Sequence, residues 1–119
     1  MTTSRRSAGD RAGLVLDALG DATRRELLAA VAAAADAGVT ATELAADRSI
    51  SRQAIVKHLQ VLAAAGLIGA EKVGREQRYG LEPARLADAA AWLTDVGAAW
   101  DQRLARLAST AARPAGPTP

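Results

Sequence analysis

The stretch ISRQAIVKHLQVLAAAGLI, residues 50–68, decides the fold because it contains a whole helix with a clear signal at each end. Ser51 is a good N-cap, and Gly66 is typical of the position that follows a helix C-terminus. Apolar residues recur between them at the spacing of a single helix face. These residues are Ile55, Leu59 and Leu62. The stretch therefore predicts an amphipathic helix between Ser51 and Gly66.

A shorter helix is predicted just before this one. Thr40 can cap it, and Glu43 three residues later completes the reciprocal capping-box pattern. This helix should end near Arg48, so a tight turn separates it from the helix that begins at Ser51. Two helices joined in this way outline a helix-turn-helix, which we place at residues 40–66.

The periodicity changes from helical to alternating after this motif. LIGAEKV and EQRYGL flank the turn residues Gly74 and Arg75, which predicts a β-hairpin over residues 67–81. Such a hairpin directly after a helix-turn-helix corresponds to a wing. The expected fold class is therefore mostly α with a small β-hairpin, a winged helix-turn-helix.

Helices are expected on both sides of the winged motif. One runs roughly over residues 10–19, and a second opens at Asp21, a good N-cap. Pro83 suits the first turn of a last helix over residues 83–108. We predict a single domain over residues 10–112.

The two ends of the chain lack these patterns. Residues 1–9 are polar without periodicity, and residues 113–119 hold three of the four prolines. Both are predicted to be disordered tails.

The predicted last helix carries an apolar seam with alternating spacings of four and three residues. A seam of this kind is typical of packing against another helix. The seam consists of Leu86, Ala90, Leu93, Gly97, Trp100, Leu104 and Leu107, and it is widened by Trp92, Val96 and Ala99. One small domain cannot cover so much apolar surface, and the alanine-rich composition without Phe provides only a thin core. A homodimer is therefore expected.

Composition excludes several classes of site. The chain has no Cys and a single His, so no disulfide framework, thiolate metal site or histidine cage is expected, and no metal or other cofactor is predicted. We also find no catalytic pairing and no glycine-rich phosphate loop. The longest apolar run is too short to cross a membrane, and no signal peptide is recognised, so a cytoplasmic protein is expected.

Basic charge is concentrated around the winged motif. Residues 48–78 contain six Lys or Arg against two Glu, although the whole chain has a net charge of only +2. On the predicted helix, Gln53, Lys57 and Gln60 point away from the apolar face, with Val56 and Arg52 beside them. Amides, Lys and a short aliphatic side chain suit a DNA major groove. The alternative is an ordinary solvated helix face.

The predicted hairpin adds a second basic group. Lys72, Arg75 and Arg78 lie around its turn, where they could hold DNA phosphates or enter a minor groove. Strand-edge charges can also serve only to prevent aggregation. His58 lies at the border of the apolar face, so we assign it to packing or a phosphate contact rather than to a metal. Trp92 and Trp100 are assigned to a dimer core.

The order of these segments resembles the ArsR family of bacterial winged-helix repressors. Four segments carry the resemblance: LDALGDATRRELL (residues 16–28), TATELAA (40–46), ISRQAIVKHLQVLAAAGLI (50–68) and VGREQRYGL (73–81). The last helix, with AAWLTDVGAAWDQRLARL over residues 90–107, is similar to a cysteine-free subgroup with two Trp there.

The resemblance implies a homodimer joined by its first and last helices, with its recognition helices in successive major grooves of an inverted-repeat operator. The motif match places Ser51, Arg52, Gln53, Lys57 and His58 at the start of the recognition helix and Lys72, Arg75 and Arg78 on the wing. From the helix faces we assign base contacts to Gln53, Val56, Lys57 and Gln60, and DNA backbone contacts to Ser51, Arg52, His58, Lys72, Arg75 and Arg78. We assign the following residues to the dimer interface: Leu14, Leu86, Trp92, Leu93, Val96, Trp100, Leu104 and Leu107. Val56 departs from the family, which commonly has Ser at that position.

Metal-responsive members of the family carry Cys on the third helix, or His and acidic ligands on the last helix. This sequence has neither Cys nor His in those places, so an effector of another kind, or none, is expected. The primary hypothesis is a dimeric repressor that binds double-stranded DNA. The alternative is a winged-helix module for protein interaction or dimerisation, and an enzyme is not expected.

Overall fold

The computed structural model describes the backbone of residues 2–112 and the side chains of residues 9–110. The C-terminal tail predicted over residues 113–119 lies outside the described residues. The elements in chain order are α1 (Thr2–Ala18), α2 (Ala22–Ala33), the short 3-10 helix η1 (Ala35–Ala37), β1 (Val39–Thr40), α3 (Ala41–Ala45), α4 (Arg52–Ala64), β2 (Ile68–Val73), β3 (Glu76–Leu81) and α5 (Pro83–Ala112).

Side-chain caps fix the starts of the central helices. The Asp21 carboxylate accepts the backbone N–H of Arg24 at the start of α2. Thr40 and Glu43 form the predicted capping box at α3, and the Ser51 hydroxyl accepts the N–H of Ala54 at α4. Each cap satisfies a helix N–H that has no partner within the helix. The predicted helix-turn-helix is confirmed.

The sheet is antiparallel in the order β1-β3-β2. The predicted hairpin is confirmed, with β2 and β3 paired from Ile68↔Leu81 to Val73↔Glu76. Gly74 has φ of 64°, the left-handed conformation that a type II′ hairpin turn needs at its first position. Strand β1 was not predicted, because two residues are too few to show an alternation.

The core lies between the helices α1, α2 and α4 and the sheet. The largest fully buried side chains are Leu27, Ile55, Leu59, Leu62, Leu67, Val15 and Val31. Tyr79 of β3 and Ala89 of α5 join the same cluster. The inner face of α4 is therefore fixed within the domain, as its apolar spacing predicted.

The two end helices differ from the sequence-based expectation. Helix α1 begins at Thr2, within the stretch of residues 1–9 for which the sequence predicted a disordered tail. Helix propagation explains the difference, because each residue added to an existing turn gains a hydrogen bond without a new nucleation cost. Helix α5 runs to Ala112 rather than 108, through a last turn rich in alanine.

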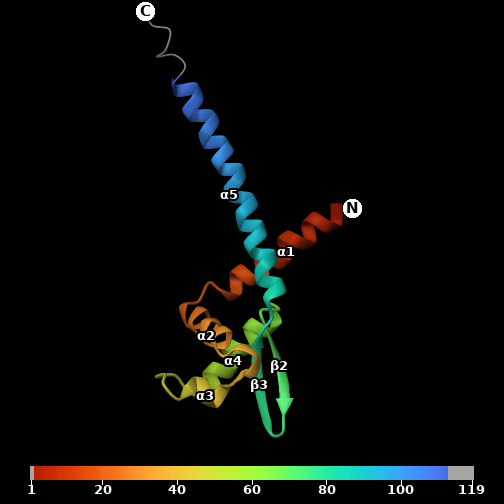
Figure 1. Ribbon diagram of the computed structural model, residues 1–119, viewed down its shortest axis with the longest axis vertical. Helices are drawn as coiled ribbons and strands as arrows, with labels where there is room; N and C mark the ends of the chain where they lie inside the picture. The colour runs from red at the N-terminus through yellow and green to blue at the C-terminus, as the bar shows by residue number, and fades with distance from the viewer. Residues whose placement is uncertain (1, 113–119) are drawn as a thin grey trace, which may run out of the picture.

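Helix α5 extends well beyond the rest of the domain. It crosses α1 near its start, where Arg11 Nε lies 3.3 Å from Asp88 Oδ2, and then continues away from the body (Figure 1). The β2–β3 turn lies at the opposite end of the molecule. Within residues 2–112, we find no helix with the length and apolarity needed to span a bilayer.

Candidate nucleic-acid interface

Helix α4 presents an exposed polar face. Gln53, Lys57 and Gln60 are exposed on that face. The opposite face is anchored by three residues whose exposed fraction is zero, namely Ile55, Leu59 and Leu62. A helix held by one face and polar on the other can contact a large ligand without loss of its packing.

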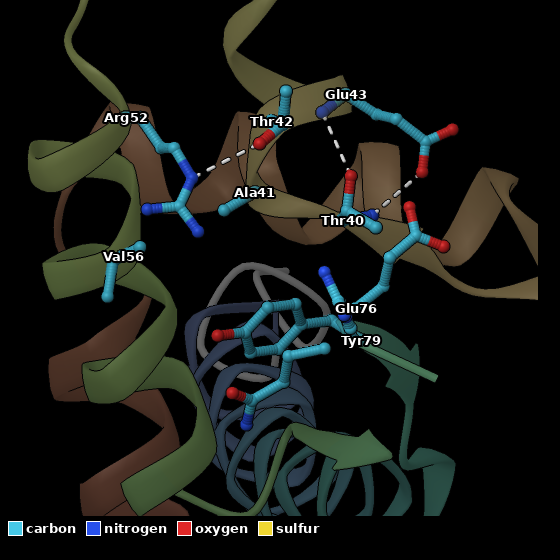
Figure 2. A pocket seen from close by; sticks show the side chains of 10 residues that line it. Thr40, Ala41, Thr42, Glu43, Arg52, Val56, Glu76 and Tyr79 are labelled. Atoms are coloured by element: carbon cyan, nitrogen blue, oxygen red, sulfur yellow. Dashed lines mark hydrogen bonds between the residues drawn. The ribbon is translucent and has the colours of Figure 1, made fainter. Parts of the chain in front are cut away.

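The start of α4 is tied to α3. Arg52 Nε donates a hydrogen bond to Thr42 Oγ1 at 3.1 Å, and both residues are exposed. Figure 2 shows this bond beside the Thr40–Glu43 capping box. The two helices of the helix-turn-helix are thus linked through side chains at their N-terminal ends.

A cleft of about 420 Å³ separates α4 from the hairpin. Arg52 and Val56 lie on its α4 side, and Glu76 and Tyr79 of β3 lie across from them (Figure 2). Val56 is half-buried and packs against the core, unlike the other predicted base-contacting residues. The hairpin therefore lies across this cleft from α4, as expected for a wing.

The strand register sorts the basic residues of the wing into two faces. Lys72 pairs with Gln77, on the same face as the buried Tyr79, whereas Arg78 pairs with Glu71 on the other face. Lys72 and Gln77 are exposed. Lys72 and Arg78 therefore do not form the single cluster that the sequence indicated.

Arg75 lies in the exposed turn and lines the cleft. Arg78 lies further from the turn, where its side chain is only 28% exposed and pairs with Glu43 and Glu76. The three predicted basic residues of the wing thus have three different surroundings.

His58 is half-buried on α4 and lies near the start of α2. The hydrogen bond from the backbone of Arg24 holds the pKa of Asp21 below its ordinary value of 3.8, and the charges of Arg24 and His58 contribute. His58 is thus partly exposed, and its role in packing or in a phosphate contact stays a prediction.

Glu43 at the first turn of α3 also has a lowered pKa. The backbone N–H of Thr40 is the main cause, the Thr40 hydroxyl adds to it, and the charge of Arg78 contributes. The ordinary value is 4.5, so the carboxylate is ionised at neutral pH.

Comparison with known proteins assigns this arrangement to a family. A model described as a helix-turn-helix domain matches residues 19–68. The structure of an ArsR-like transcriptional regulator from Rhodococcus sp. RHA1 is 41% identical, covers 88% of this chain and 96% of its own, and has a TM-score of 0.77. The chain belongs to the ArsR family of transcriptional regulators.

Two further structures agree with the ArsR assignment. A protein described as a possible transcriptional regulator for arsenical resistance is 35% identical, with 80% of this chain and 93% of that chain covered and a TM-score of 0.62. Another ArsR family transcriptional regulator is 26% identical, with 78% and 93% covered and a TM-score of 0.68. No match to a curated protein was found.

Most of the ArsR dimer residues predicted from the sequence form an exposed apolar face. Leu14 of α1 is 57% exposed, and Trp100 of α5 is 53% exposed with Arg103 stacked 5.8 Å from its ring centre. The other exposed members are Trp92, Leu93, Val96, Leu104 and Leu107. Leu86 differs, because it is half-buried against the core of its own chain.

Sequence reasoning missed several residues of this ArsR site. Thr42, Glu43 and Glu76 line the cleft and hold or face the basic side chains, but none was singled out for that role. The capping-box pattern at Glu43 was recognised, but its ion pair with Arg78 joins residues distant in sequence. Among the described residues, no group of three or more His, Cys, Asp or Glu could hold a metal ion.

Proposed function

We propose that this ArsR-family regulator represses transcription by binding an inverted-repeat operator as a homodimer. One observation carries the proposal above all: the polar face of α4 is exposed while its apolar face is fixed in the core. A helix held in this way fits a major groove about 12 Å wide. The wing beside α4 supplies basic side chains that can contact the phosphates of the neighbouring DNA backbone.

Sequence preference comes from the polar face of α4 in this proposal. The amides of Gln53 and Gln60 suit adenine edges, Lys57 suits guanine, and the methyl groups of Val56 can meet a thymine methyl. The half-buried position of Val56 lets it approach a base only at the mouth of the cleft.

Backbone contacts supply most of the affinity in this proposal. We assign them to Ser51, Arg52, His58, Lys72 and Arg75. Arg52 contacts Thr42 through Nε, so its Nη groups are the ones proposed for a phosphate. Such contacts release counterions, and binding should weaken steeply as salt rises.

The homodimer is proposed to form through α5 with a contribution from α1. The exposed stripe from Trp92 to Leu107 and the exposed Leu14 of α1 supply its apolar surface. Twofold symmetry repeats one surface patch on both subunits and requires two inverted half-sites. Their centres should lie about 10 bp apart, or a multiple of that spacing.

A duplex-binding titration tests the proposal. Fluorescence anisotropy is measured at low salt with labelled duplexes from the region upstream of the gene and with random duplexes. We expect binding to both, tighter to an upstream duplex that contains the operator, and a steep loss between about 50 and 200 mM salt. If neither set binds at micromolar protein, the DNA-binding proposal is wrong.

The exposed stripe on α5 favours one alternative, in which the winged domain is a protein-interaction module. This alternative predicts a folded protein that binds no duplex at any salt concentration. The same titration therefore separates the two.

A further inference from the structure

Arg78 is held by groups from three segments of the chain. Its Nη1 donates to the carbonyl oxygens of Ala37 and Gly38 at 3.4 Å each and lies 3.6 Å from Glu43 Oε1. Its Nη2 donates to Glu76 Oε1 at 3.1 Å. A guanidinium can satisfy several acceptors at once because its N–H groups form a planar fork. The side chain therefore joins β3 to the segment before β1 and to α3.

Glu43 carries this connection to the start of α3. Its Oε1 accepts the backbone N–H of Thr40 at 3.0 Å, and Thr40 pairs with Arg78 in the β1–β3 ladder. The adjacent residue Thr42 accepts the hydrogen bond from Arg52 of α4. Two side-chain contacts, Arg78 to Glu43 and Arg52 to Thr42, thus meet at adjacent residues of the first turn of α3 and connect the wing to the start of α4 through the backbone of that turn.

The position of Arg78 separates it from the proposed DNA surface. It lines a groove with Ala37, Gly38 and Glu71, and its side chain projects from the face of the sheet opposite to that of the Tyr79 side chain. Arg75 and Gln77 line the cleft next to α4 instead. Arg78 is not among the residues that line this cleft, although its partners Glu43 and Glu76 are.

We propose that Arg78 and Glu43 form a clamp that fixes the wing at a set angle to α4, so that Arg78 acts as a positioning residue for DNA binding. The inference rests on the proposed DNA-binding function. It replaces the expectation that Arg78 holds a phosphate. The clamp keeps Lys72 and Arg75 at a fixed distance from α4, so that both can contact the same duplex. Without the clamp the wing would be mobile, and its ordering on binding would lower the affinity for DNA.

Glu43→Gln distinguishes the clamp from a phosphate contact, because the two predict opposite signs. Gln keeps the capping box, since it can still accept the Thr40 N–H, but it removes the charge that holds Arg78. If Arg78 held a phosphate, loss of a nearby negative charge would tighten binding. The clamp predicts binding weaker by roughly threefold to tenfold, the scale of a partly exposed ion pair counted in two subunits.

Arg78→Lys is the second variant, because it keeps the charge and removes the fork. The clamp predicts a similar loss of affinity, whereas a phosphate contact would be largely retained. In both variants the slope of log K against log salt should match wild type, since every phosphate contact remains. Glu71→Gln is the matched control: Glu71 is exposed and lies across from Arg78 on β2, so the change removes a negative charge from the wing but none of the printed contacts of Arg78 with Glu43 and Glu76, and DNA affinity should equal or exceed that of wild type.

The outcomes are distinct when folding is confirmed by circular dichroism. Weaker binding by both variants with an unchanged salt slope supports the clamp. Wild-type or tighter binding by either one, or a reduced slope, overturns it. If wild type binds no duplex, the proposed function fails, and hydrogen exchange still decides the clamp. Faster exchange of β1 and β3 amides in Arg78→Lys supports it, and unchanged exchange overturns it.

Discussion

The winged body and the projecting part of α5 use apolar residues in opposite ways. In the body, Leu27, Leu59 and Leu67 have exposed fractions of zero and pack into one cluster. In α5, every side chain over residues 91–110 is exposed, although the helix carries two Trp and several Leu. The periodicity of both regions predicts an apolar face, but only the fold shows whether the same chain covers it.

This difference concerns where each region gains its stability. Burial of a large apolar side chain contributes about 1.5–3 kcal/mol, and the body gains this within a single chain. The projecting part of α5 gains this burial free energy only when another surface covers its apolar side chains. Without such a partner it is an isolated helix, which has only marginal stability in water. The body should therefore fold as a monomer, whereas the projecting part should depend on association.

The largest expected effect is loss of the dimer in Trp100→Glu. An aromatic residue at the centre of an interface contributes about 2 kcal/mol or more, and a twofold dimer contains it twice. The dimer dissociation constant should rise on the order of a thousandfold. Analytical ultracentrifugation measures it.

Ala98→Glu is the matched control for Trp100→Glu. Ala98 is exposed on the same helix and lies about 160° around it from Trp100, outside the apolar stripe. The control should keep the wild-type dimer. Equal loss in both variants would mean that the stripe is not the interface.

The next largest effect is a loss of stability in the body. Leu59→Ala leaves a cavity at a fully buried position on the inner face of α4 and should lower the free energy of unfolding by about 2–5 kcal/mol. In a monomeric Trp100→Glu background, Leu107→Ala should change that free energy far less, because Leu107 is 60% exposed. Urea denaturation measures the free energy of unfolding of each variant. An equal loss at Leu59 and Leu107 would show that the body and the projecting part of α5 do not differ in how they bury apolar side chains.

Lys57→Ala should weaken specific DNA binding by about 1–3 kcal/mol and relax preference at one base pair. Lys57 is exposed on α4, away from the projecting helix, so the dimer should be unaffected. Competition with duplexes that differ at single positions checks both expectations. A uniform loss on all sequences would assign Lys57 to the backbone instead.

Arg75→Gln should lower the affinity for DNA by less than Lys57→Ala does, and by the same factor for all duplexes. Arg75 lies in the exposed wing turn, so its removal should weaken every duplex alike and reduce the salt slope by about 0.9 for each phosphate that it neutralises. A salt titration of wild type and variant provides the two slopes. Identical slopes would show that this arginine makes no phosphate contact.

The smallest expected effect is a dependence of body stability on pH. Asp21 and Glu43 have folded-state pKa values below their ordinary values of 3.8 and 4.5, so their charged forms stabilise the fold. That contribution is complete above the ordinary values and is lost as pH falls through the folded-state values. Thermal unfolding from pH 7 to 3 should show a decline below about pH 4.5 that is smaller in Asp21→Asn. An unchanged profile in that variant would contradict the role of the cap.

Local signals in the sequence were sufficient for the body. The capping box at Thr40 and Glu43, the cap at Ser51 and the turn at Gly74 act within a few residues, so each could be recognised from the sequence. The sequence did not predict that helix α1 extends to Thr2. Residues 2–9 show no helical periodicity, and a helix propagates from a turn that is already formed rather than from a local pattern.

Long-range pairing accounts for the other differences. Strand β1 exists because Val39 meets Tyr79, and the surroundings of Arg78 follow from a register that brings it to Glu43. Neither partner can be identified from spacing alone. The exposed polar face of α4 was predictable because its helix is amphipathic, whereas the two faces of the wing required the observed strand pairing.

Selection of bound duplexes from a random-sequence pool shows whether the protein binds DNA as a symmetric dimer. We expect enrichment of an inverted repeat whose half-site centres lie about 10 bp or a multiple apart, because two α4 helices of a symmetric dimer contact the same side of the duplex. Recovery of unrelated sequences, or of one unrepeated motif, would contradict it.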